Sequence, residues 1–118
     1  MIKEIEVKKS EINFTIELDQ ENVPERIIWQ ASDQPDSEPE ETKSIAISLW
    51  DHKQKNTLRI DLWSKDMPVL EMKRFYIDTI GGMAQSILNA TGDDFISQEM
   101  NNLCEKLVEY LKNEPQDG

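Results

Sequence analysis

The sequence has little of what enzymes and metalloproteins use for chemistry. Its 118 residues include one cysteine, one histidine and four glycines. A lone cysteine, Cys104, cannot form an internal disulfide, and one cysteine with one histidine cannot build a zinc cage. The only adjacent glycines are Gly81 and Gly82, so there is no glycine-rich loop to cradle a phosphate. We therefore predict no metal ion, no cofactor and no catalytic residue.

Long apolar runs and surplus basic charge are also absent. No apolar run exceeds three residues, whereas a membrane span needs about 20. The first six residues include acids where a signal peptide needs an apolar core. Thirteen basic residues against 24 acidic ones give a net charge of −11, which opposes binding to nucleic acid or anionic lipid. We expect a soluble, cytoplasmic protein that inserts into no membrane.

Apolar residues alternate with polar ones in the first half of the chain, which is typical of strands with one buried face. In residues 12–18, for example, Ile12, Phe14, Ile16 and Leu18 share one parity. The same reasoning predicts strands at 26–31, 44–51 and 57–63. The connections at 19–24 and 52–56 are short enough for hairpins. We therefore predict a four-stranded antiparallel sheet.

Residues 32–42 interrupt this pattern with five acids, two prolines and no base. Such a segment cannot bury enough apolar surface to offset the entropy of ordering it. We interpret it as a mobile acidic loop; the alternative is an acidic docking segment.

The period changes to that of helices after residue 63. Asp66 is the predicted N-cap of a helix whose apolar stripe runs from Val69 to Ile87, and Gly92 is its predicted end. Asp93 or Asp94 can cap a second helix, which carries a stripe from Ile96 to Leu111. We predict an α+β fold in which two C-terminal helices pack on the apolar face of the sheet. The chain is then a single domain, 1–118, with an ordered core at about 9–111 and a frayed tail at 113–118.

Few side chains are candidates for function. His52 lies beside Asp51 in a predicted turn, and we interpret it as exposed; Cys104 is interpreted as an inert thiol on a helix. Trp50 and Trp63 have the outward parity of neighbouring strands, where they can approach each other across the sheet. With Arg59 and Asp61 on the same parity they form a candidate protein-binding surface. The alternative, left open, is that both tryptophans are buried under loop 32–42.

The glycine pair lies in the middle of the first predicted helix, where each glycine costs about 0.8–1 kcal/mol relative to alanine. A hinge is one explanation. We favour the other, close packing against a neighbouring element.

Several motifs resemble the gliding motility protein GldC family of Bacteroidetes-type bacteria. The resemblance covers roughly residues 9–111 and rests on short runs in a shared order. They are Lys9-Ser10-Glu11-Ile12, Leu18-Asp19, Asn22-Val23-Pro24-Glu25, Ile28-Trp29, Ser48-Leu49-Trp50-Asp51, Ile60-Asp61-Leu62-Trp63-Ser64-Lys65-Asp66-Met67, Glu71-Met72-Lys73 and Ala90-Thr91-Gly92-Asp93.

The resemblance implies a cytoplasmic accessory protein of the gliding motility system, with no catalytic residue or cofactor to carry over. The leading hypothesis is a non-enzymatic interaction protein that supports assembly or stability of motility components. Its partner is a motility protein or a second copy, and a basic partner would gain from the acidic charge. One alternative is a holdase, because the predicted fold resembles the SecB-type export chaperone. Another is an enzyme, which needs a deep pocket where acids converge with His52 or Tyr76.

Overall fold

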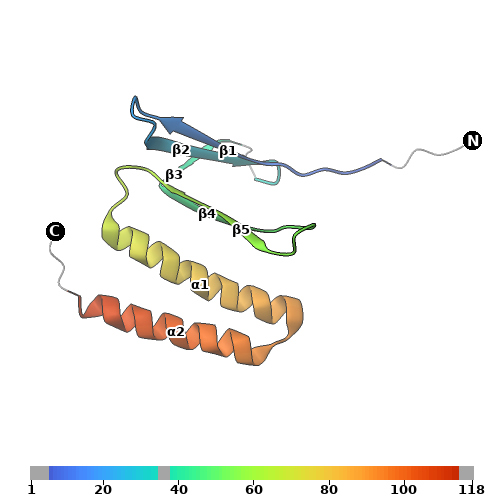
Figure 1. The fold of residues 1–118 in the computed structure, drawn as a ribbon, viewed down its shortest axis with the longest axis vertical. Coiled ribbons are helices and arrows are strands. Elements are labelled where there is room, and N and C mark those ends of the chain that lie inside the picture. The colour runs from blue at the N-terminus through green and yellow to red at the C-terminus, as the bar shows by residue number, and fades with distance from the viewer. Residues whose placement is uncertain (1–5, 35–37, 115–118) are drawn as a thin grey trace, which may run out of the picture. The chain divides into compact units, whose positions relative to one another are not determined.

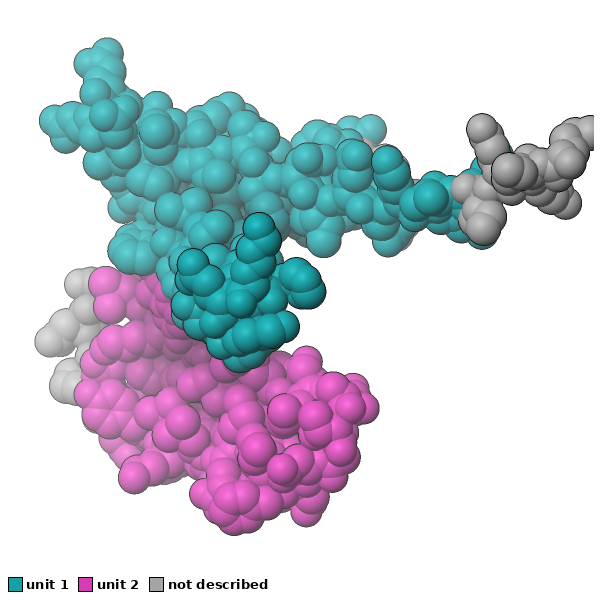
Figure 2. Space-filling model, turned by 45° about the vertical axis from the view of Figure 1, so that its right-hand side comes forward, with its two compact units in different colours: residues 1–67 teal, residues 68–118 magenta. Residues whose placement is uncertain are grey.

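The chain forms strands first and helices second, as the change of hydrophobic period predicts (Figure 1). The computed structural model describes residues 6–34 and 38–114. Their elements are β1 (Ile12–Leu18), β2 (Pro24–Ala31), β3 (Glu40–Thr42), β4 (Ser44–Trp50), β5 (Thr57–Trp63), α1 (Val69–Thr91) and α2 (Asp94–Lys112). The chain divides into two compact units, which we call the strand unit (residues 1–67) and the helical unit (residues 68–118) (Figure 2). The predicted α+β class with two C-terminal helices is confirmed.

The strands form two antiparallel sheets, so the prediction of one four-stranded sheet is wrong. One sheet has the order β1-β2-β3, and β4 and β5 form a separate hairpin. The physical reason lies at Lys43, the single residue between β3 and β4. On one side of Lys43, Thr42 pairs with Ile27 of β2, and on the other, Ser44 pairs with Trp63 of β5. The third predicted strand, 44–51, corresponds to β4 and pairs with β5 alone, while β3, directly before Lys43, belongs to the other sheet.

Strand β3 lies within the segment predicted to be an acidic loop. Charge pairing across the sheet explains why acids are tolerated there. Arg26 on β2 lies 3.5 Å from Glu41 of β3 and 3.8 Å from Glu17 of β1. Residues 35–37 of the segment lie outside the described part of the chain. The mobility of segment 32–42 stays a prediction.

The segment after β5 joins the two sheets. The Ser64 N–H donates to the Lys43 carbonyl at 2.9 Å, and the Lys65 N–H donates to the Pro24 carbonyl at 2.9 Å. The buried Ser64 hydroxyl donates to Asp66 at 2.7 Å, and Lys43 donates to the same carboxylate at 2.9 Å. Asp66 is therefore occupied within the strand unit. The prediction that Asp66 is the N-cap of α1 is wrong. The N-cap is Pro68, which makes no side-chain cap bond.

Burial in the strand unit centres on Ile27, which is fully buried. It pairs with Ile16 on β1 and with Thr42 on β3, so one row of side chains crosses the three strands. The predicted burial of the whole apolar parity of β1 is wrong, because Ile12, Phe14 and Leu18 are exposed.

The helical unit is an antiparallel pair, and the turn between its helices was predicted correctly. Gly92 ends α1 with a φ of 75°, and its N–H donates to the Leu88 carbonyl at 2.8 Å. Asp93 then caps α2 by accepting a hydrogen bond from the Ile96 N–H at 3.0 Å. Small side chains line the helix contact: the Ser97 hydroxyl donates to the Ala84 carbonyl at 2.9 Å, and the Cys104 thiol lies 3.5 Å from the Ile77 carbonyl.

The end of α2 is held by an ion pair between Lys73 of α1 and Glu114. Residues 115–118 of the predicted frayed tail lie outside the described part. Fraying of the tail and the single-domain organisation stay predictions.

Candidate protein-binding surface

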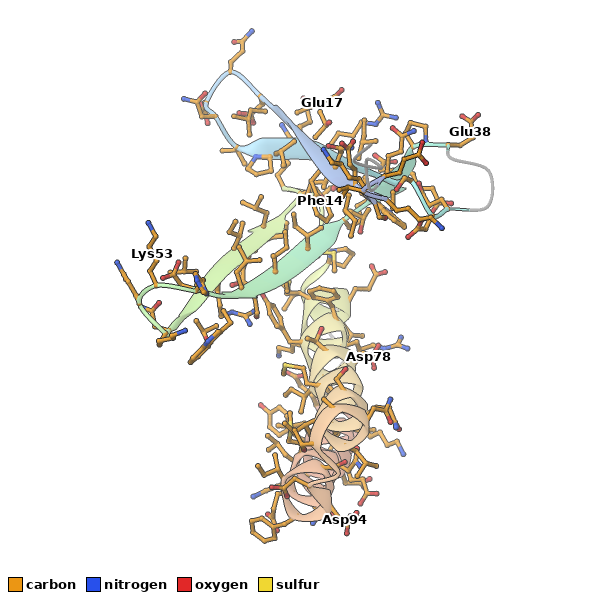
Figure 3. All side chains as sticks on the ribbon, turned by 90° about the vertical axis from the view of Figure 1, so that its right-hand side faces the viewer. Phe14, Glu17, Glu38, Lys53, Asp78 and Asp94 are labelled. Carbon is orange, nitrogen blue, oxygen red and sulfur yellow. The ribbon has the colours of Figure 1, made fainter. Side chains whose placement is uncertain are left out.

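The β4–β5 hairpin has two faces of different chemistry, which follow from its register and from the alternation of side chains along a strand. The aliphatic face consists of six residues: Ile45, Ile47, Leu49, Leu58, Ile60 and Leu62. The tryptophan face is the opposite one and carries the predicted binding residues: Trp50, Arg59, Asp61 and Trp63. Figure 3 shows this hairpin with Lys53 at its turn.

The two tryptophans lie at opposite ends of the tryptophan face. Trp63 pairs with Ser44 at the start of β4, and Trp50 pairs with Thr57 at its end. Six residue steps along β4 separate these pairs, which corresponds to about 20 Å at the rise of a strand. The prediction that the tryptophans approach each other is therefore wrong. In an antiparallel hairpin the last residue of one strand pairs with the first residue of the other, so the last residues of β4 and β5 lie at opposite ends. Their exposed fractions are 67% for Trp50 and 50% for Trp63.

A fixed polar group lies between the tryptophans. The Arg59 guanidinium donates to both oxygens of Asp61, at 2.8 and 3.3 Å, and to the Ser48 hydroxyl at 2.6 Å. Two parallel bonds to one carboxylate hold a guanidinium plane in a defined orientation. The face thus presents two large aromatic side chains on either side of an oriented ion pair.

The other predicted candidates form no site with one another. His52 is exposed in the turn after β4, and the Asp51 carboxylate beside it accepts from the Gln54 N–H at 2.6 Å. Tyr76 lies on α1 and lines a groove of about 300 Å³ with Met72, Lys73, Ile77, Leu107, Tyr110 and Leu111, none of which is an acid. Within residues 6–34 and 38–114, no three histidine, cysteine or acidic side chains cluster as metal ligands would.

The charges of the strand unit that are most perturbed lie at the junction of its sheets. Asp19 accepts backbone N–H groups of Val23 and Glu21 and the ammonium of Lys65, and these bonds, with Val23 first, hold its pKa below 3.8. The hydrogen bond to Asp19 in turn raises the pKa of Lys65 above 10.5. The Ser64 hydroxyl, followed by Lys43, lowers the pKa of Asp66. These are structural ion pairs rather than a reactive site.

The predicted apolar stripe of α2 includes Ile96 and Leu103 but not Tyr110, and the prediction missed that these three side chains form an exposed row. Ile96, Leu103 and Tyr110 recur every seven residues and are exposed. The stripe predicted from Ile96 to Leu111 treats α2 as having one apolar side. The spacing of seven residues from Leu103 to Tyr110, which repeats the spacing from Ile96 to Leu103, was the signal that could have distinguished a second apolar side of α2.

The architecture defines a small acidic α+β protein whose hairpin presents an exposed aromatic face. A family model described as "Gliding motility-associated protein GldC-like" matches residues 24–113, about three quarters of the chain. The chain therefore belongs to the GldC-like family, as the resemblance implied. The match covers β2 to the end of α2, whereas β1 and its motifs lie outside it.

Neither the curated proteins nor the solved structures include a significant match to the chain. Among the described residues, neither helix is long and apolar enough to cross a bilayer.

Proposed function

We propose that the chain is a non-enzymatic, cytoplasmic accessory protein that binds another protein of the gliding motility machinery and supports its assembly or stability. Membership in the GldC-like family supports the cellular context. The tryptophan face supports a binding role, and its two exposed tryptophans around an oriented Arg59–Asp61 pair are the observation that carries the proposal.

The chemistry of this face matches that of interface hot spots. Tryptophan and arginine are enriched among residues whose truncation costs about 2 kcal/mol or more in binding. The two indoles offer apolar area, and the Arg59–Asp61 pair offers donors and acceptors in a fixed direction. Anchors about 20 Å apart suit an extended partner surface better than a small molecule.

The acidic charge of the chain favours a basic partner. A net charge of −11 raises the encounter rate with a positively charged protein, and salt screens this effect. The complex should therefore be recovered best at low ionic strength.

Affinity capture from the native cell at low salt tests this function. The wild-type chain should retain a defined motility protein, and the double variant Trp50→Ala with Trp63→Ala should lose it. Phe95→Ala, which removes an exposed aromatic side chain from α2, is the matched control and should retain the partner. Loss of the partner in both variants, or in neither, would overturn the role of the tryptophan face.

A holdase is the second candidate, favoured by the exposed Leu49, Leu58 and Ile60 on the aliphatic face. A holdase would retain many unrelated unfolded proteins, and an excess of one denatured client would displace the others. Retention of one defined protein that a denatured client does not displace supports the accessory role.

We also propose that the aliphatic face is the inward face of the hairpin, as the hydrophobic pattern of its strands predicts. A two-stranded hairpin alone is marginally stable in water, so its apolar face is the one on which stability depends. Ile60→Asp should then lower the melting temperature steeply, since a carboxylate in an apolar contact costs several kcal/mol. Asp61→Asn, on the opposite face, should change it little. Equal melting temperatures would contradict the assignment.

A further inference from the structure

Helix α2 carries two rows of side chains that each repeat every seven residues. Seven residues make almost two helical turns, so the members of one row share one side of the helix. The first row is Ser97, Cys104 and Leu111, and two of its members contact α1 through Ala84 and Ile77. The second row, Ile96, Leu103 and Tyr110, follows one residue behind and points about 100° away.

The second row is left uncovered. The exposed fractions of Ile96, Leu103 and Tyr110 are 43%, 44% and 62%. Met100 and Leu107 lie between the two rows, so the apolar residues at 96, 100, 103, 107 and 110 alternate in steps of four and three. This spacing is the heptad pattern of a helix that packs against another helix. Helix α1 occupies only one side of α2, which leaves the second row for another helix.

We propose that the second row of α2 binds the same row of a second copy of this chain, with the two α2 helices antiparallel about a two-fold axis near Leu103. The row is self-complementary in that orientation. Leu103 meets Leu103 of the second copy near the axis, while Ile96 and Tyr110 lie seven residues on either side and meet each other. A two-fold interface requires this correspondence, in which each contact occurs twice.

The charges beside the row fit the same orientation. Glu99 and Lys106 flank the row on the side away from α1, again seven residues apart. Antiparallel pairing brings Glu99 of each copy opposite Lys106 of the other, which forms two equivalent ion pairs. Charges at such flanking positions set partner choice and orientation. Glu105 and Glu109 lie on the opposite side of α2, so the acidic charge of the chain does not concentrate at the row.

The size of the row determines the strength of the dimer. Stable interfaces bury about 1,200–2,000 Å². Two heptads of one helix are short for this, so Tyr76 and Met83 of α1 extend the contact on the side of the Tyr76–Tyr110 groove. We therefore expect a reversible dimer whose population depends on concentration.

Sedimentation equilibrium of the full chain tests the proposal. The wild type should reach twice 13.7 kDa as its concentration rises, and Leu103→Asp should remain at 13.7 kDa with unchanged helix content by circular dichroism. Val108→Asp is the matched control, because Val108 lies on the same helix with a similar exposed fraction, 42%, but outside the row. It should dimerise like the wild type. A monomeric wild type at all concentrations, or equal effects of both variants, would overturn the proposal.

A charge-reversal pair tests the orientation and does not depend on the Leu103 variant folding. Glu99→Lys and Lys106→Glu each place like charges across the axis, so each should weaken the dimer roughly ten-fold. An equimolar mixture of the two variants restores opposite charges in the heterodimer and should recover dimeric mass. No recovery in the mixture would overturn the antiparallel arrangement.

The dimer and the function proposed above can be tested independently of each other. The variant Trp50→Ala with Trp63→Ala should keep the dimeric mass, and Leu103→Asp should keep its Trp-dependent motility partner. Leu103→Asp that stays monomeric and melts at a lower temperature, beside a wild type that is also monomeric, would show that the row packs within its own chain.

Discussion

Lys65 makes three of the contacts that join the two sheets. Its N–H donates to the Pro24 carbonyl, and its ammonium lies 3.1 Å from Asp19 and 3.3 Å from Glu25. The hydrogen bond between the Lys65 ammonium and the Asp19 carboxylate is among the causes both of the lowered pKa of Asp19 and of the raised pKa of Lys65. Polar residues directly after β5 therefore supply contacts between the two sheets of the strand unit.

The lowered pKa values predict acid sensitivity of the strand unit. Asp19 and Asp66 have folded pKa values below 3.8, so their stabilisation is complete above 3.8 and is lost as pH falls through the folded values. The melting temperature should hold from pH 7 to about pH 5 and fall below about pH 4. Asp19→Asn should lower it at pH 7 and flatten this acid limb. A variant with an unchanged acid limb would contradict the assignment.

Burial predicts a large difference between two isoleucines of neighbouring strands. Ile27 is fully buried, so Ile27→Ala should lower the free energy of unfolding by about 2–5 kcal/mol. Ile12 on β1 is exposed, and Ile12→Ala should lower it by less than about 0.5 kcal/mol. Urea titration of both variants measures the difference, and similar losses would place the core elsewhere.

At the scale of elements, the sequence predicts those features of strands and helices that depend on residues close together in the chain. The bounds of β1 and β5, the end of α1 at Gly92 and the cap at Asp93 follow from local patterns and are confirmed. The change of sheet at Lys43 was not predictable, because β3 lies in a segment whose acids and prolines are typical of a loop. Asp66 was misassigned because its partners, Ser64 and Lys43, become visible only when the sheets meet.

The candidate surface shows the same division. Alternation alone placed Trp50, Arg59, Asp61 and Trp63 on one face, and the register bears out this shared face. The distance between the tryptophans required the register of the hairpin, which the turn sets. The split of α2 into two rows required knowledge of which side contacts α1.

The glycines of α1 give a prediction at the scale of one helix. A Cβ at Gly81 would lie 3.8 Å from the Cys104 sulfur, an ordinary contact, and a Cβ at Gly82 would meet nothing within 4 Å. The expected close packing therefore holds for Gly81 alone. Gly82→Ala should raise the free energy of unfolding by up to about 1 kcal/mol through helix propensity. Gly92→Ala should lower it, because Gly92 has a φ of 75°. Thermal melts that place Gly82→Ala below the wild type would contradict this account.

At the scale of the whole molecule, the chain combines a strongly acidic charge with separate exposed apolar surfaces. The tryptophan face is mixed in chemistry and suits a different protein, whereas the second row of α2 is self-complementary and suits another copy. A dimer would present two tryptophan faces and bind a repeated partner more tightly than a monomer, through effective concentration.

Site-specific photo-cross-linking in the native cell tests the central claim, a motility partner on the tryptophan face, most directly. The reactive residue replaces Thr57, which pairs with Trp50 across the hairpin, and the control position is the exposed Gln98 on α2. The account predicts one defined adduct with a gliding motility protein from position 57, which disappears in the Trp50→Ala, Trp63→Ala background. No adduct at position 57, or the same adducts from positions 57 and 98, would contradict it.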